Sequence, residues 1–173
     1  DGFNLTGCLL PQDISGVPGE TNLPPTFPLL GATPLDPVTC VSRASGSTPP
    51  EFQVVGVQDP NGDEDQLLTA RWFLDYDPAD DTSTSPIKTD LLAPDSPPAD
   101  GDYGWTYTVP QYNSLLLPIT LSLGTHVLEV VISDGFDVAT ASPANRKAKT
   151  GRYTVTKGWT IKYVDTAPCE GGS

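Results

Sequence analysis

The sequence predicts an all-β protein, namely an antiparallel β-sandwich of about seven short strands that follows a long proline-rich arm. The first observation is composition: 19 prolines and 16 glycines among 173 residues favour turns and extended segments over helices. The second is the apolar stretches from residue 51 onward, several of which alternate with polar residues at the period of two that is typical of strands. The third is the turn-forming residues that separate these stretches.

The N-terminal part of the chain differs from the rest. Residues 1–50 have no sustained period and are dense in proline, glycine, serine and threonine, so we expect an extended arm or tether. The arm is more apolar than a free linker, which indicates that part of it docks on its own domain or on a neighbouring subunit. We expect residues 51–169 to form the sandwich and residues 170–173 to form a short tail.

The first expected strands enclose an acidic turn. "EFQVVGV" is a short strand and "QDPNGDEDQ" is a turn. "LLTARWFLDYD" alternates, with one face formed by Leu68, Ala70, Trp72 and Leu74 and the other by Arg71, Phe73 and Asp75. Residues 78–102 are polar and rich in proline, which favours one long loop.

The later strands follow closely upon one another. "YGWTYTVP" and "SLLLPITLSL" are the next two. "HVLEVVISDGFD" is apolar on both faces, as an interior strand is when both sides are covered. "RYTVTKGWTIKYV" alternates again and closes the domain.

The net charge of −13 disfavours nucleic acid as a partner, because phosphate recognition needs a basic face. The charge is uneven: residues 59–102 carry twelve acids and two bases, whereas residues 143–163 carry six bases and no acid. No window reaches the roughly 18 apolar residues of a membrane span. The chain also lacks methionine, so we expect that an upstream leader has been removed, as happens on secretion.

The cysteines Cys8, Cys40 and Cys169 lack the spacing of a zinc site. A disulfide with one cysteine left over fits better. Cys40–Cys169 would clamp the two ends of the domain and stabilise it by about 4–5 kcal/mol in the chain-entropy model. Cys8–Cys40 is the alternative pairing.

Two resemblances to known families appear. "VQDPNGDEDQLLTARWFLDYD", followed by "GTHVLEVVISDGFD", resembles the Ig-like domains of bacterial surface proteins, particularly the PKD and cadherin-like groups. This resemblance implies an Ig-like sandwich used for adhesion, spacing or assembly. "LTGC" is similar to the lipobox of bacterial lipoproteins, which implies lipidation of Cys8 and a lipid anchor. The alternative is an ordinary secreted protein in which Cys8 is unmodified.

The acidic turn offers a candidate calcium site. Oxygen-bearing side chains alternate along it, and calcium accepts six to eight oxygen ligands in flexible geometry. The candidate ligands are Asp59, Asn61, Asp63 and Asp65. The competing interpretation is a turn whose Asp and Asn side chains cap its own backbone. No other cofactor is indicated.

The sequence assigns no catalytic residue, and we expect a protein that is not an enzyme. His126 is the only histidine, and no Gly-x-Ser-x-Gly motif accompanies it. The aromatic side chains of Tyr103, Trp105, Tyr107 and Tyr112 offer a platform for sugar rings, although strand aromatics more often fill a core.

The leading hypothesis is a structural, assembly or adhesion module of the bacterial cell envelope or surface. It would be extracytoplasmic, either at the cell surface, associated with the outer membrane or secreted, and its partners would be other envelope or surface proteins or copies of itself. The basic residues Arg146, Lys147, Lys149 and Arg152 are the candidate interaction surface, since they would attract an acidic face. The alternative is a secreted module that binds calcium or carbohydrate.

Overall fold

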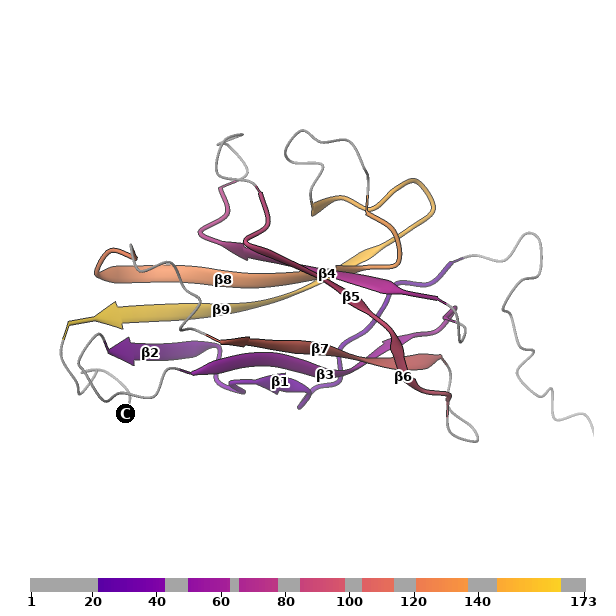
Figure 1. The fold of residues 1–173 in the computed structure, drawn as a ribbon, viewed down its shortest axis with the longest axis horizontal. Coiled ribbons are helices and arrows are strands. Elements are labelled where there is room, and N and C mark those ends of the chain that lie inside the picture. Colours follow the sequence, from indigo (N-terminus) through magenta and orange to yellow (C-terminus); the bar gives the residue numbers. More distant parts are fainter. Residues whose placement is uncertain are drawn as a thin grey trace, which may run out of the picture.

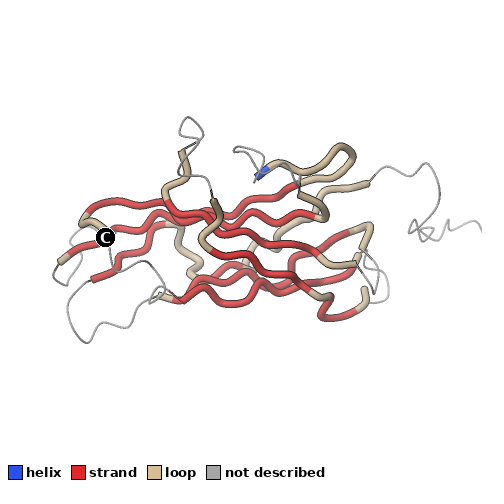
Figure 2. The backbone as a smooth tube through the Cα atoms, turned by 45° about the horizontal axis from the view of Figure 1, so that its top comes forward, coloured by secondary structure: helices blue, strands red, loops and turns tan. Residues whose placement is uncertain are grey.

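The computed structural model describes residues 22–42, 50–62, 66–77, 85–98, 104–113, 121–136 and 146–165 (Figures 1 and 2). The elements of these residues are all strands. They are β1 (Ala32–Thr33), β2 (Val38–Ser42), β3 (Glu51–Asp59), β4 (Leu68–Leu74), β5 (Lys88–Leu92), β6 (Pro94–Ser96), β7 (Trp105–Asn113), β8 (Gly124–Ser133) and β9 (Thr154–Val164). The predicted all-β class is confirmed.

The strands form two sheets that lie one above the other in Figure 1. The four-stranded sheet has the order β1-β3-β7-β6, and the five-stranded sheet has the order β2-β9-β8-β4-β5. All pairings are antiparallel except that of β2 with β9, which is parallel. The second sheet is therefore mixed, where the sequence predicted antiparallel pairing throughout.

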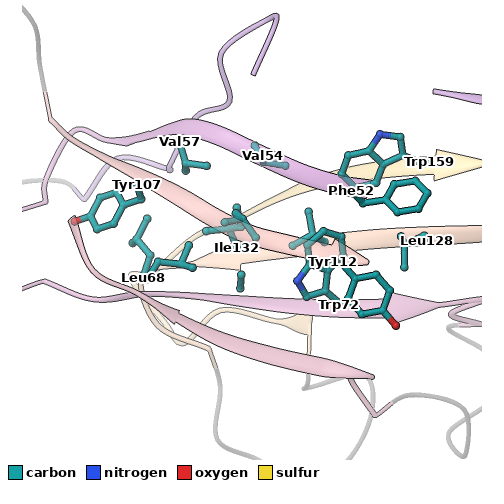
Figure 3. Packing of buried hydrophobic residues seen from close by; sticks show 14 of the residues in the cluster. Phe52, Val54, Val57, Leu68, Trp72, Tyr107, Tyr112, Leu128, Ile132 and Trp159 are labelled. Carbon is teal, nitrogen blue, oxygen red and sulfur yellow. The ribbon is translucent and has the colours of Figure 1, made fainter. Parts of the chain in front are cut away.

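Side chains from both sheets meet in one core, as expected of a β-sandwich. Trp72 is fully buried and stacks on Tyr112 and Trp159, with ring centroids 5.0 and 6.1 Å apart (Figure 3). Phe52 meets the Trp159 ring edge-on at 5.3 Å. Because these rings come from β3, β4, β7 and β9, they join the two sheets.

The period-two face predicted for β4 is confirmed. Leu68, Ala70 and Trp72 are buried in the core, and the residues that alternate with them along β4 lie on the other face of the sheet. Phe73 is nevertheless buried as well, because it packs with Val131, Phe136 and Tyr76 in a second, smaller cluster on the outer face of the five-stranded sheet. Both faces of this sheet are thus covered locally.

The expectation of one loop over residues 78–102 is wrong, because this segment contains β5 and β6. β5 pairs with β4 in one sheet, and β6 pairs with β7 in the other. Only Ala93 separates the two strands, so the chain passes from one sheet to the other at that residue. Both strands lie at the edge of a sheet.

The described part of the expected arm belongs to the sheets. Residues 22–42 supply β1 and β2, and Phe27 packs against the core. The indole N–H of Trp159 donates to the carbonyl of Pro34 at 2.9 Å, and the N–H of Thr160 donates to that of Pro37 at 2.6 Å. This segment therefore docks on its own domain, one of the two outcomes expected for the arm.

Within the described ranges, no helix is long and apolar enough to cross a membrane.

Candidate functional site

Asp59, the first candidate calcium ligand, holds the turn after β3. Its side chain is fully buried. One carboxylate oxygen accepts the N–H of Asn61 at 3.1 Å, and the other accepts the side-chain amide of Gln66 at 2.9 Å. The carbonyl of Asp59 accepts the N–H of Gly62 at 3.1 Å. These bonds close the turn and tie it to the start of the next strand, which is the capping role that the sequence offered as the alternative to calcium.

Of the other candidate calcium ligands, Asn61 lies within the described residues. The side-chain oxygen of Asn61 accepts the N–H of Leu23, so it fastens the N-terminal segment to this turn. Asp63 and Asp65 lie outside the described residues. The described part of the chain brings together no group of three or more acidic, histidine or cysteine side chains. Calcium binding therefore stays a prediction, to be tested by ligand addition.

His126 lies where β8 begins, beside Asp75 at the end of β4. Asp75 has a φ of +49°, a left-handed conformation that Asp tolerates better than most residues. One carboxylate oxygen of Asp75 accepts the N–H of Val127, and the carbonyl of Val127 accepts the N–H of Asp75, both at 2.8 Å. Asp75 thereby links the end of β4 to the start of β8 and leaves its second oxygen for the histidine.

Both ring nitrogens of His126 have hydrogen-bond acceptors. Nδ1 lies 2.6 Å from the Asp75 carboxylate, and Nε2 lies 2.8 Å from the carbonyl oxygen of Ser122. Since neither acceptor can donate, both nitrogens must carry a proton for both bonds to form, and the ring is then a cation. Burial lowers the pKa of His126, but the hydrogen bonds to Asp75 and Ser122 and the charge of Asp75 outweigh this effect, so the pKa is raised.

This arrangement restricts what His126 can do chemically. A general base needs an unprotonated nitrogen within reach of its substrate, and here both nitrogens lie within hydrogen-bond distance of acceptors in the protein itself. The side chain is also 10% exposed, which limits access to it. His126 as placed joins β8, β4 and the segment before β8.

The basic residues proposed as an interaction surface divide into two kinds. Arg146 makes a bidentate pair with Glu129 of β8, with N–O distances of 2.7 and 3.2 Å. Its guanidinium also lies 4.2 Å from the ring centre of Tyr76. Arg152 donates to Asp134 at 3.3 Å. By contrast, Lys147 and Lys149 are exposed, so these two lysines are better placed to meet a partner.

Asp134 is a polar centre that sequence reasoning missed. Its side chain is fully buried at the end of β8, and it accepts hydrogen bonds from the side chains of Asn22 and Arg152 and from the N–H of Tyr153. Asn22 also donates to the carbonyl of Gly151 at 3.0 Å. Asp134 therefore fastens the N-terminal segment to the connection between β8 and β9. In the sequence, only the position of Asp134 hints at this role, since it stands between the "IS" residues that end the strand and Gly135.

Of the three cysteines, the structure describes Cys40 alone. Cys40 lies in β2, in register with Lys162 near the end of β9. Cys8 and Cys169 lie outside the described residues, so the disulfide and the lipidation stay predictions.

The aromatic residues considered as a sugar platform do not form one among the described residues. Tyr107 and Tyr112 are buried in the core, and Trp105 is half-buried against it. Tyr103 lies outside the described residues. The interpretation of these strand aromatics as core residues is confirmed for Tyr107 and Tyr112.

The outer face of the four-stranded sheet is a surface that the sequence did not predict. We call its middle the neutral face, and it comprises the outward residues of β1, of β7 and of residues 52–58 in β3, with the adjoining turn at residues 28–31. Exposed acidic residues border it, Glu51 at the start of β3 and Asp95 in β6. The described segments 22–35, 52–58 and 104–113, which build it, contain no charged residue. Leu29 and Leu30 in this turn are 94% and 75% exposed, and Val55 of β3 is 44% exposed. This combination of apolar exposure and missing charge is the clearest candidate for a binding surface.

Comparison of the chain with known protein families, with curated proteins and with solved structures found no match. The fold itself therefore defines the class: an all-β, sandwich-like protein whose buried polar side chains connect its strands and turns.

Proposed function

We propose that this chain is an Ig-like module with a non-enzymatic, structural role outside the cytoplasm, where it contacts other protein subunits of a bacterial cell envelope or surface. The order of the strands supports the Ig-like part of this proposal. Ig domains place strands A, B, E and D in one sheet and G, F and C in the other, and some add C′ beside C. With β1, β3, β7 and β6 as A, B, E and D, and β9, β8, β4 and β5 as G, F, C and C′, the order agrees.

The parallel pairing of β2 with β9 adds to this support. β1 and β2 follow each other along the chain but join different sheets, β1 beside β3 and β2 beside β9. The first strand of the domain is thus divided between the two sheets. Because of this division, each sheet gains one short strand from the N-terminal segment, and residue 42 lies beside residue 164.

The hydrogen bonds of the buried polar side chains support the proposed structural role. Among the described residues, Asp59, His126 and Ser133 are buried, as is the side chain of Asp134, and each bonds to backbone or side-chain groups of neighbouring segments. An enzyme needs such groups to face its substrate. A module that spaces or contacts other subunits can instead use them to hold its strands and turns in place. By contrast, Lys147 and Lys149 are exposed, as are the apolar side chains of Leu29 and Leu30.

The contact role is tested in cells that produce the protein. Intact cells are treated with an amine-reactive cross-linker that does not cross membranes, and the cross-linked peptides are identified by mass spectrometry. We expect links from Lys147 and Lys149 to another surface protein or to a second copy. The variant Lys147→Glu/Lys149→Glu is the matched control, since it leaves the pairs of Arg146 and Arg152 intact. A protein that reacts only after lysis would overturn the proposed location.

The cysteines provide a second test of location. Intact mass before and after reduction should show a Cys40–Cys169 bridge, because oxidising compartments favour disulfides between the ends of secreted domains. A further mass corresponding to a diacylglyceryl group on the Cys8 peptide would establish a lipid anchor. Three fully reduced, unmodified cysteines in the natively purified protein would contradict the extracytoplasmic assignment.

A further inference from the structure

We propose that a second copy of this chain pairs with the edge strand β5, so that two copies associate through an antiparallel β5–β5 contact with a two-fold axis at Thr89. This inference rests on the proposed role in assembly and names both the partner and the surface. The neutral face presents apolar side chains without a feature that selects an occupant, whereas the residues of β5 complement those of a second β5.

β5 is an edge strand that has room for another strand beside it. Among the described residues it pairs with β4 alone, and it continues through residue 93 into β6 of the other sheet (Figure 1). An unpaired strand edge is a template for pairing with another chain.

The other edge strands are less suited to such pairing. β1 has two residues, and β6 has three, of which the first is Pro94 and the second is the exposed Asp95. Short length, proline and exposed charge all protect an edge. β2 is as long as β5, but it has no charged residue that would fix the register of a contact.

The outward side chains at this edge are uncharged and exposed. Leu92 is buried in the core, and exposed residues alternate with partly buried ones along β5, so Thr89 and Leu91 turn away from the core. Leu91 is 69% exposed, and Ile87, two residues before Thr89, is 41% exposed. The edge therefore offers an apolar side chain on either side of Thr89.

The two charges of β5 balance each other. Nζ of Lys88 lies 3.0 Å from a carboxylate oxygen of Asp90, and the same oxygen accepts the indole N–H of Trp72 at 3.3 Å. Since Trp72 belongs to the core, both charged side chains lie on the inner side of the strand. β5 thus brings no net charge to a contact between two chains that each carry a net charge of −13.

Pairing about Thr89 places complementary residues of the two copies opposite each other. When residue 89 lies opposite residue 89 in an antiparallel pair, residue 88 lies opposite residue 90, and residue 87 lies opposite residue 91. Lys88 of each copy then meets Asp90 of the other, and Ile87 meets Leu91. The two-fold axis makes each contact twice. Cross-strand pairs of opposite charge and of apolar side chains both stabilise a sheet.

The neighbouring registers are disfavoured by the same residues. Opposite residues of a sheet face the same side, so a symmetric register can shift only by moving the axis to another residue. An axis at Asp90 would place Asp90 opposite Asp90, and an axis at Lys88 would place Lys88 opposite Lys88. Like charges directly opposite each other are destabilising. The sequence of β5 is therefore complementary to itself in one register, which is why we infer that the occupant is a second copy.

Cysteine cross-linking tests the register. Thr89→Cys places two thiols opposite each other, where Cβ atoms are about 4.5–5.5 Å apart, close to the reach of a disulfide. Leu91→Cys is the matched variant, and its two thiols lie about 13 Å apart, because four residues separate them along the strands. After mild oxidation, mass spectrometry should find the residue-89 peptide joined to its own copy, and no such product at residue 91. Equal yields at the two positions, or no product at either, would overturn the register.

Exchange of charges tests the contact in the full chain by sedimentation equilibrium over a range of concentrations. We expect a monomer–dimer equilibrium in the wild type. Lys88→Glu and Asp90→Lys should each raise the dissociation constant at least about tenfold, because each places like charges opposite each other twice. An equimolar mixture of the two variants should dimerise again. In the mixed dimer, the new carboxylate at position 88 meets the new amine at position 90, and the unchanged Asp90 and Lys88 meet as well.

The mixture also separates the contact from effects on folding, since a misfolded variant is not rescued by the other. Leu29→Asp/Leu30→Asp is the control on the neutral face and should dimerise like the wild type. A wild type that stays monomeric at every concentration, or a mixture that associates no better than the single variants, would overturn the inference. If such a wild type still gives links from Lys147 and Lys149 to a different surface protein on intact cells, the proposed function stands without the dimer.

Discussion

Replacing Arg146 with alanine should lower the free energy of unfolding by about 2–3 kcal/mol, whereas the same change at Lys147 should have almost no effect. The two residues are neighbours in a basic segment that the sequence presents as one surface. In the structure, Arg146 pairs with Glu129 and lies over the Tyr76 ring, and Lys147 is exposed. The comparison therefore separates a residue that holds the fold from one that is available to a partner.

The magnitude follows from burial and geometry. Arg146 and Glu129 are 18% and 22% exposed, so the pair is neither at the surface nor fully buried. Exposed ion pairs contribute about 0.2–1 kcal/mol, and removing one partner of a buried pair costs about 3–5 kcal/mol. An intermediate cost of about 2 kcal/mol is expected here. The contact of the guanidinium with the Tyr76 ring at 4.2 Å adds about 0.5–1 kcal/mol.

Urea unfolding followed by tryptophan fluorescence gives the free energies directly. Arg146→Lys should fall between the wild type and the alanine variant, because lysine keeps the charge but cannot form the two-pronged bond with Glu129. A double-mutant cycle with Glu129→Gln isolates the pair from the ring contact. Equal destabilisation by the alanine changes at Arg146 and Lys147, within about 0.5 kcal/mol, would refute the reasoning.

Three further predictions concern pH, packing and calcium. Folding raises the pKa of His126, so its contribution to stability is present below its unfolded pKa of about 6.5 and is lost as pH rises through the folded pKa. Urea unfolding of the wild type and His126→Gln at several pH values should show this loss. Free energies of unfolding that change with pH in parallel in the two proteins would argue against it. Gly31→Ala should destabilise by about 1–3 kcal/mol, since a Cβ there would meet the carbonyl oxygen of Val55 at 2.3 Å; thermal unfolding equal to that of the wild type would disprove the close contact. If the acidic turn binds calcium, adding the ion raises the melting temperature and Asp63→Asn/Asp65→Asn removes the shift; an unchanged melting temperature in the wild type rejects the site.

The faces of the long strands could be predicted from the sequence because strand periodicity is local. Leu68, Ala70 and Trp72 alternate with Arg71 and Phe73, and the first three are in the core. The burial of Phe73 could not be predicted in this way. It depends on Val131 and Phe136, which are far along the chain and reach Phe73 only through the pairing of β4 with β8.

The short strands could not be predicted, because their pairing is not local. β1 has two residues and β6 has three, and each lies in a proline-rich segment without a period. β2 is a strand because it lies against β9, more than a hundred residues away in sequence. Edge strands of this length pair with a strand that is already in place, so their own residues carry little signal.

Residue type was a poor guide to the candidate site for a related physical reason. Asp59 and His126 belong to types that bind metals and transfer protons, and sequence reasoning therefore weighed them for those roles. A sandwich with tight connections leaves backbone N–H and carbonyl groups unpaired at every turn, and short polar side chains are the means of satisfying them. In this chain, Asp59, Asp75 and His126 do so.

The alternation that allows the core to be predicted from the sequence does not reveal a binding face. Along β3, the buried Phe52, Val54 and Val57 are interleaved with Gln53, Val55 and Gln58, so Gln53 and Gln58 read as ordinary polar positions of an amphipathic strand. Their meaning emerges only when β7 and the turn at residues 28–31 are placed beside them, since the absence of charge is then shared by three separate segments. Charge is depleted at the centres of protein interfaces, so this shared absence marks the middle of the face as a place to look for a contact. For this fold, a search for function is therefore better directed at the outward composition of each sheet than at the titratable residues of its turns.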